Sequence, residues 1–124
     1  MNMITLELKT HPDVLFAYTN HNIDLILRVE NKDEISWVEA DVSIPNKISL
    51  SPTNSLDKGR VRVGIVNKDE SMEKGVKLYA SPYTNPQMYR CKIILYAYNK
   101  DGTIETRIEK AMDVRCEPKK KEVI

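Results

Sequence analysis

The feature that most constrains this 124-residue chain is the alternation of apolar and polar residues along almost its whole length. A period of two is that of a β-strand with one buried face, whereas an amphipathic helix needs a period of about 3.6. Clusters of Asn, Asp, Gly and Pro interrupt the alternation at the spacing of short strands joined by turns. The sequence therefore predicts an all-β fold, a two-sheet antiparallel sandwich of about seven to nine strands.

The alternation also predicts where the strands lie and which residues face the core. We expect strands at 4–8, 14–18, 23–29, 36–44, 60–66, 76–80, 88–98 and 103–116, a short apolar edge segment at 47–51 and a polar loop at 67–75. The expected core positions include Ile23, Leu25, Leu27, Val29, Val38, Ala40, Val42, Val61, Val63, Ile65, Tyr89, Cys91, Ile93, Leu95 and Ala97. The apolar positions of the last strand are Ile104, Ile108, Met112 and Val114.

Length and composition favour one domain over residues 1–117, followed by a charged, flexible tail at 118–124. The net charge of +1 argues against a nucleic-acid-binding role, for which a basic face is expected. No stretch reaches the roughly 20 apolar residues that a membrane span needs. The first residues alternate like a strand and do not form a signal peptide, so we expect a cytoplasmic protein.

The two cysteines are expected to be free thiols. With a two-residue hairpin at Asp101 and Gly102, Cys91 faces Met112, and Cys116 lies four residues further on, about 13 Å away. A disulfide requires Cα atoms within roughly 7 Å, so only a longer hairpin loop would allow the bridge.

Two stretches resemble a known family. LRVENKDEISWVEADVSIPNKISLSP (residues 27–52) and PQMYRCKIILYAYNKDG (residues 86–102) are similar to immunoglobulin-like modules of the CARDB-like or adhesion type. The overall sequence also resembles small prokaryotic proteins, those of archaea included. The resemblance implies an immunoglobulin-like sandwich and a role in adhesion, carbohydrate-protein stalks or assembly. It also implies a tyrosine corner at Tyr89, whose hydroxyl would bond to nearby backbone.

Three turns repeat the tripeptide Asn-Lys-Asp, at 31–33, 67–69 and 99–101, and the expected topology places all three at one end of the sandwich. Asn and Asp favour turns because their side chains bond their own backbone, and this is the preferred interpretation. The alternative is a ligand or calcium site built from carboxylates of these loops. Its candidate residues are Asp33, Glu34, Asp69, Glu70 and Asp101.

A second candidate site lies on the sheet formed by 36–44, 88–98 and 103–116. The alternation turns five residues outward there: Arg90, Ile94, Tyr96, Tyr98 and, on the neighbouring strand, Trp37. Exposed aromatic residues with Arg are typical of the centre of a protein interface. Two alternatives remain, namely that Trp37 turns into the core, and that the tyrosines are simply good strand formers.

Catalysis is not expected. His11 and His21 are the only histidines, and neither falls beside a candidate nucleophile in the expected topology. The sequence holds no metal-ligand cluster and no glycine-rich phosphate loop, so no cofactor and no metal are predicted. We therefore expect a non-enzymatic interaction or assembly module. It would bind a protein partner, or itself, through the aromatic sheet face or an edge strand.

Overall fold

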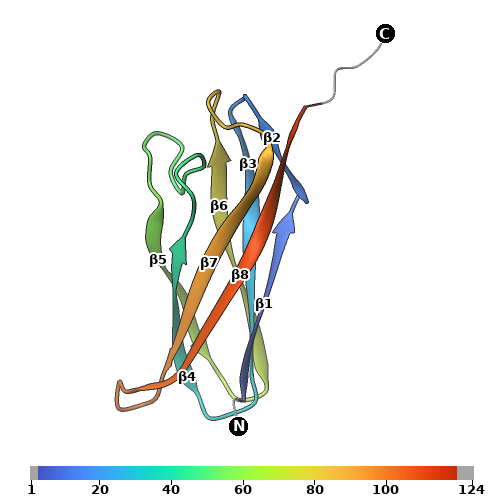
Figure 1. Cartoon of the computed structure of the whole chain (residues 1–124). Helices are drawn as coiled ribbons and strands as arrows, with labels where there is room; N and C mark the ends of the chain where they lie inside the picture. Colours follow the sequence, from blue (N-terminus) through green and yellow to red (C-terminus); the bar gives the residue numbers. More distant parts are fainter. Residues whose placement is uncertain (1–2, 120–124) are drawn as a thin grey trace.

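A computed structural model of the chain describes residues 3–119. In this range the chain forms eight β-strands and no helix, and therefore no helix that could cross a membrane. The strands are β1 (Ile4–His11), β2 (Val14–Ala17), β3 (His21–Asn31), β4 (Ser36–Ser43), β5 (Lys58–Val66), β6 (Glu70–Ala80), β7 (Gln87–Tyr98) and β8 (Ile104–Pro118). They pack as a three-stranded sheet β1-β3-β6 on a five-stranded sheet β2-β8-β7-β4-β5 (Figure 1). The prediction of an all-β, two-sheet sandwich is confirmed.

The core follows the alternation in the central strands. In β3 the inward side chains are large aliphatics, each 1% exposed or less: Ile23, Leu25, Leu27 and Val29. The predicted inward residues of β7 are buried in the same way: Tyr89, Cys91, Ile93, Leu95 and Ala97. Burying one large aliphatic side chain contributes roughly 1.5–3 kcal/mol, so these two strands hold the sheets together.

The corner between β6 and β7 is also as predicted. The Tyr89 hydroxyl donates a hydrogen bond of 2.6 Å to the Asn85 backbone oxygen, and lies 3.0 Å from the side-chain oxygen of the same residue. The ring is 1% exposed. The expected tyrosine corner is confirmed, and it fixes the direction in which the chain enters β7.

The middle of the chain departs from the prediction in its pairing. Residues 58–66 pair with β4 and therefore belong to the five-stranded sheet. The predicted polar loop at 67–75 is shorter, because β6 begins at Glu70 and pairs with β3 along its whole length. In the first half of β6, residues 70–75, Met72 alone is partly buried and the other residues are exposed, so the sequence there lacks the alternation that marks a strand. The predicted edge segment 47–51 forms only an isolated bridge from Ser49 to Tyr79.

A register shift changes the outward face of β5. Val38 pairs with Gly64 and the next residue of β4 pairs with Arg62, so Val63 is an extra residue. Gly64 has φ of 118°, a left-handed conformation that glycine adopts without strain. After the shift the alternation is reversed, and Ile65 is 53% exposed. The prediction that Ile65 faces the core is therefore wrong.

A second shift lies at the start of β8. Cys91 pairs with Met112, as predicted, and both cysteines are free and buried. At the turn, however, Tyr98 pairs with Ile104 while the preceding residue of β7 pairs with Thr106. The extra residue in β8 turns Ile104 to the same face as Tyr98, where it is 50% exposed.

The C-terminal end of β8 runs beside β2. β2 pairs in parallel with β8, the one parallel pairing among the described strands. Pro118, placed in the tail by the sequence, is the last residue of β8. Residues 120–124, the larger part of the predicted charged tail, lie outside the described residues.

Candidate protein-interaction face

Four apolar side chains form a line across the outer face of the five-stranded sheet. Ile65 of β5 lies opposite Trp37 of β4, Trp37 lies opposite Tyr98 of β7, and Tyr98 lies opposite Ile104 of β8. Residues directly opposite each other in a ladder share one face of the sheet. Trp37 is 37% exposed, between the two more exposed isoleucines. We call Ile65, Trp37, Tyr98 and Ile104 the apolar row.

The apolar row borders a shallow hollow at the end of the sheet. The hollow has a volume of about 180 Å³. It is lined by Ile35, Ser36, Trp37, Ile65, Tyr98, Asn99 and Lys100. The turn between β7 and β8 contributes to the hollow, since its Asn99 and Lys100 are among the lining residues. The row is therefore accessible and has a relief into which a side chain of a partner can fit.

Polar contacts link side chains of β4, β5 and β7 beside the apolar row. The Trp37 indole donates to the Glu39 carboxylate at 3.0 Å. Arg60 donates to both oxygens of Asp41, at 2.8 and 3.2 Å, and lies 5.7 Å from the centre of the Tyr96 ring. The hydrogen bond from Arg60 lowers the pKa of the Asp41 carboxyl, so this pair stays charged in neutral solution. These contacts orient the two aromatic rings before any partner arrives.

Basic side chains surround the apolar row. Arg62 of β5 is the outward residue next to Ile65, Arg107 of β8 lies opposite Tyr96, and Lys100 is in the adjoining turn. Arg107 is 3.5 Å from Glu109, whereas Arg62 and Lys100 form no ion pair within residues 3–119. Arg62 and Lys100 therefore bring cationic groups without an ion-pair partner in the described part of the chain to the border of the row.

The structure brings most of the predicted partner-binding residues together. Trp37, Tyr96, Tyr98 and Ile94 lie on adjacent strands of one sheet face, Ile94 opposite Asp41. Arg90 lies on the same face further along β7, where its guanidinium is 3.5 Å from the Asp113 carboxylate. Sequence reasoning missed Ile65 and Ile104, because both depend on an extra residue that reverses the alternation. Gly64, a glycine inside a strand, was the available signal for the first.

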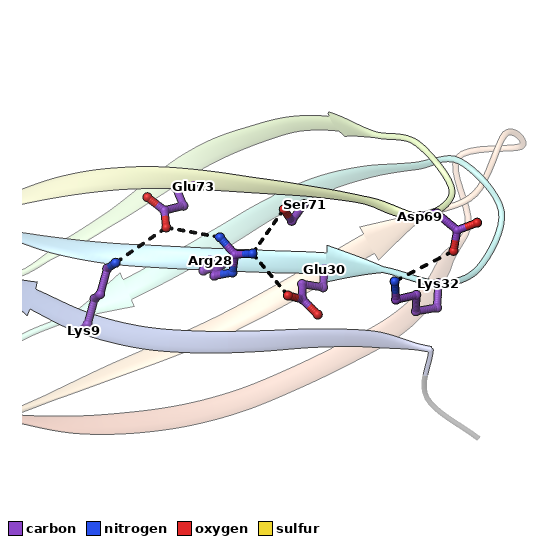
Figure 2. Close-up of polar contacts among 7 residues, drawn as sticks. All are labelled: Lys9, Arg28, Glu30, Lys32, Asp69, Ser71 and Glu73. Carbon is purple, nitrogen blue, oxygen red and sulfur yellow. Dashed lines mark hydrogen bonds and ion pairs between the residues drawn. The ribbon is translucent and has the colours of Figure 1, made fainter.

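The outer face of the three-stranded sheet is different in kind. Arg28 lies 3.4 Å from Glu73 and 3.3 Å from Glu30, and Lys9 is 3.6 Å from Glu73 (Figure 2). Ser71 accepts a further hydrogen bond from Arg28. Exposed pairs of this kind contribute little stability, but they keep the face hydrated and free of a large apolar patch. An interface is therefore favoured on the opposite sheet.

The Asn-Lys-Asp turns lie at one end of the sandwich, and the side chains of Asn31 and Asn99 form hydrogen bonds with backbone groups there. Asn31 is fully buried, and its amide donates to the backbone oxygens of Glu34 and Val66 at 2.9 and 3.0 Å. The Asn99 side-chain oxygen accepts two backbone N–H groups of its own turn. This is the turn role that was the preferred interpretation.

The carboxylates of these turns do not gather. Lys32 lies 4.0 Å from Asp69, across the two turns (Figure 2), and Asp33 accepts the N–H of Glu34. Glu70 accepts from the Asn67 side chain. Within residues 3–119 no three His, Cys, Asp or Glu side chains are placed to hold a metal ion. The geometry therefore gives no support to calcium binding through Asp33, Glu34, Asp69, Glu70 and Asp101.

The candidate nucleophiles and bases are in structural roles. Burial raises the pKa of the Cys91 thiol to about 12 and also raises the pKa of Cys116, which disfavours the reactive thiolate. His21 accepts the backbone N–H of Phe16 and packs on its ring, with 4.5 Å between ring centres. Burial lowers the pKa of His21, which keeps the ring neutral. None of these groups is poised for nucleophilic attack.

No protein-family model and no curated protein sequence matches this chain. Solved structures do share its fold. A red sea bream transglutaminase aligns with a TM-score of 0.61 at 16% identity, over 96% of this chain and 17% of its own length. A CARDB domain from Pyrococcus furiosus aligns with a TM-score of 0.54 at 14% identity, over 96% of this chain and all of that domain.

The sporulation control protein of Bacillus subtilis aligns with a TM-score of 0.55 at 8% identity, over 96% of this chain and 51% of its own. The chain thus spans about a sixth of the transglutaminase and about half of the sporulation protein. At these identities the likeness shows the fold alone. It confirms the resemblance to a CARDB-like, immunoglobulin-like sandwich.

Proposed function

We propose that this domain is a non-enzymatic protein-interaction module whose contact surface is centred on the apolar row. The observation that carries the proposal is a line of apolar side chains on four adjacent strands, of which Ile65, Trp37 and Ile104 are exposed and Tyr98 is half-buried. Full burial of an isoleucine is worth roughly 1.5–3 kcal/mol, and Ile65 and Ile104 leave about half of their surface exposed, so each forgoes about 0.8–1.5 kcal/mol. A bound partner would recover that free energy.

The charge around the row defines the partner. Arg62 and Lys100, which have no ion pair within residues 3–119, form a basic rim, while Glu39 is engaged by Trp37 and Arg60 and Arg107 is paired with Glu109. A second copy of the chain would bring the same basic groups against each other. A different protein, with an apolar surface bordered by carboxylates, fits both the row and its rim.

The first test is the state of the protein alone. Light scattering over a range of concentrations should give the mass of a monomer, because the basic rim opposes a symmetric contact. A dimer that Trp37→Ser dissociates would overturn the assignment of a different protein as the partner, and would make this a self-assembly module.

The second test identifies the partner and measures its affinity. Proteins retained by the wild type are compared with those retained by Trp37→Ser/Ile65→Ser and by Arg28→Ser/Glu73→Ser, the matched change on the other sheet. The retained protein is then titrated by calorimetry. Loss of central interface residues should weaken binding by about 30-fold or more, and added salt should weaken it further. Equal affinity for the wild type and the row variant would refute the proposal.

A further inference from the structure

The three-stranded sheet stops one strand short on one side. β6 pairs with β3 along its length, but on its other side only Ser49 bridges to it. The Tyr79 N–H donates to the Ser49 oxygen at 2.8 Å, and the Ser49 N–H returns a bond of 3.0 Å. The chain then turns away, since the Leu50 N–H bonds to the Leu56 oxygen. A single residue, Ser49, therefore pairs with β6 on this side, and no strand of the described chain continues from it along β6.

The rest of this edge presents unpaired backbone. In an antiparallel strand, successive residues direct their N–H and C=O groups alternately to the two sides. Tyr79 directs its groups to Ser49, so every second residue before it faces the same way. These residues are Ser71, Glu73, Gly75 and Lys77, all exposed. On this side they have no backbone partner within residues 3–119. Such an edge can accept an extended chain.

The sandwich has two lateral sides, one between β1 and β8 and one beside β6, and they differ in the polar contacts that cover them. Partly buried apolar side chains line both: Leu8, Ile108 and Met112 between β1 and β8, and Leu50, Val61, Met72 and Val76 beside β6. Between β1 and β8, Lys110 points inward and its ammonium group donates to the Leu6 backbone oxygen. Beside β6 the corresponding inward residue is Lys74, opposite the buried Leu27. Lys74 has no ion pair or hydrogen bond among the described residues.

Gly75 lies at the middle of the open edge. Glycine in the interior of a strand is destabilising relative to alanine, and no contact within residues 3–119 requires it here. Its φ is not in the left-handed range, and an added Cβ would meet no atom closer than 3.9 Å, on Asp24. A glycine of this kind suits a place where another backbone approaches closely.

We propose that β6 binds an extended segment of a partner protein as a fourth, antiparallel strand of this sheet, with an acidic side chain of that segment against Lys74. β5 of the five-stranded sheet lies next to β6 in Figure 1, and a Cβ added at its Gly64 would contact the Met72 side chain.

The register fixes the order of residues in the segment. Inward positions lie opposite Val76, Lys74 and Met72, which favours apolar, acidic and apolar residues in that order. Outward positions lie opposite Lys77, Gly75 and Glu73, which favours an acidic residue, an aromatic one over the glycine, and a basic one. The segment would read acidic, apolar, aromatic, acidic, basic, apolar. Because the apolar row and this edge share no residue, the inference stands apart from the proposed function.

A designed peptide tests the edge directly. Its sequence is Thr-Glu-Val-Tyr-Glu-Lys-Val-Thr, and its control exchanges every Glu and Lys. Titration of the ¹⁵N-labelled protein should move the amide signals of Ser71, Glu73, Gly75 and Lys77. The first peptide should bind about tenfold more tightly than the control, from three reversed cross-strand charge pairs. Absence of binding by the first peptide, or signals that move elsewhere, would overturn the inference.

Two variants sharpen the test. Gly75→Pro removes the N–H that faces the open side, where proline is tolerated, and should abolish binding. Gly75→Ala retains that N–H and should bind within about threefold of the wild type. Lys74→Glu reverses one of the three charge pairs, so the preference for the first peptide should fall from about tenfold to about twofold. This variant decides the matter if the proline variant does not fold. A folded Gly75→Pro protein that binds normally, or an unchanged preference in Lys74→Glu, would refute the added strand.

Discussion

The buried amide of Asn31 joins two turns at one end of the sandwich. Although Asn31→Asp changes only one atom group of the side chain, we expect it to lower the free energy of unfolding substantially. The change keeps the shape of the side chain. It replaces the Nδ2 group, which donates to the Glu34 and Val66 oxygens, with an oxygen that repels both. The bond that the side-chain oxygen accepts from the Asp33 N–H is retained.

The expected cost follows from these contacts. Two lost hydrogen bonds account for about 1–3 kcal/mol, and an uncompensated buried charge adds to this. We expect a loss of about 3–4 kcal/mol in the free energy of unfolding near neutral pH, measured by urea denaturation. In a domain of this size that corresponds to a fall in Tm of about 10–15 °C.

The loss should depend on pH in a defined direction. Burial raises the pKa of the new carboxyl in the folded state above the value of about 3.9 that it has in the unfolded chain. The charged form is penalised only when folded, so the penalty is full at neutral pH and shrinks as the pH falls through the folded pKa. The wild type and the variant should therefore approach each other in stability between about pH 7 and pH 4.

Asn99→Asp is the matched control. The Asn99 side-chain oxygen accepts the N–H groups of Asp101 and Thr103, and an aspartate oxygen accepts them equally well. We expect this variant to lose less than about 0.5 kcal/mol. A loss below about 1 kcal/mol for Asn31→Asp at neutral pH, or an equal loss at pH 4, would refute the role assigned to the buried amide.

Three further changes test other parts of the fold. Tyr89→Phe removes the hydroxyl that bonds to Asn85 and should cost about 1–2 kcal/mol in urea denaturation, whereas no loss would mean that the corner bond does not stabilise the fold. Leu27→Ala should cost about 2–5 kcal/mol, since the side chain is fully buried, and a surface-like effect would contradict the inward face of β3. Cys91 and Cys116 should resist iodoacetamide at about pH 8 until the protein is unfolded, and rapid labelling of the native protein would contradict their burial. Burial raises the pKa of Cys91 from 9.0 to about 12, so between these values the thiol ionises in the unfolded chain but not in the folded protein. The free energy of unfolding should therefore keep the full contribution of this thiol below pH 9.0 and lose it as the pH rises toward 12.

The sequence predicted the fold where a strand is buried on one face only. In β3 and β7 every second residue is apolar, because that face meets the core and the other meets water. The same rule set the register of the last hairpin, in which Cys91 faces Met112 as expected. The tyrosine corner was predictable because Tyr89 stands at the start of a strand just after a proline-rich corner.

The rule failed where its premise did not hold. In β6, Met72 is the one apolar side chain before Val76, so a single apolar position gave no alternation and residues 70–75 were expected to form part of a loop. Ile65 and Ile104 were assigned to the inner face by counting every second residue along their strands. One extra residue in each strand turns them to the outer face, and the sequence composition does not reveal it. Half of the apolar row was therefore invisible to the alternation. Trp37 and Tyr98, on strands without an extra residue before them, were placed on the outer face from the sequence.

The unequal closure of the two open sides also limits how these molecules can polymerise. Growth of an endless ladder through the three-stranded sheet would need two edges that accept a strand, one on each side of the sheet. At the β1 edge, Lys110 already occupies the Leu6 oxygen. At the β6 edge, the backbone groups of residues 71–77 have no partner on the outer side within residues 3–119. The two edges are therefore unequal, and growth through repeated head-to-tail pairing of β1 with β6 is disfavoured at its β1 end.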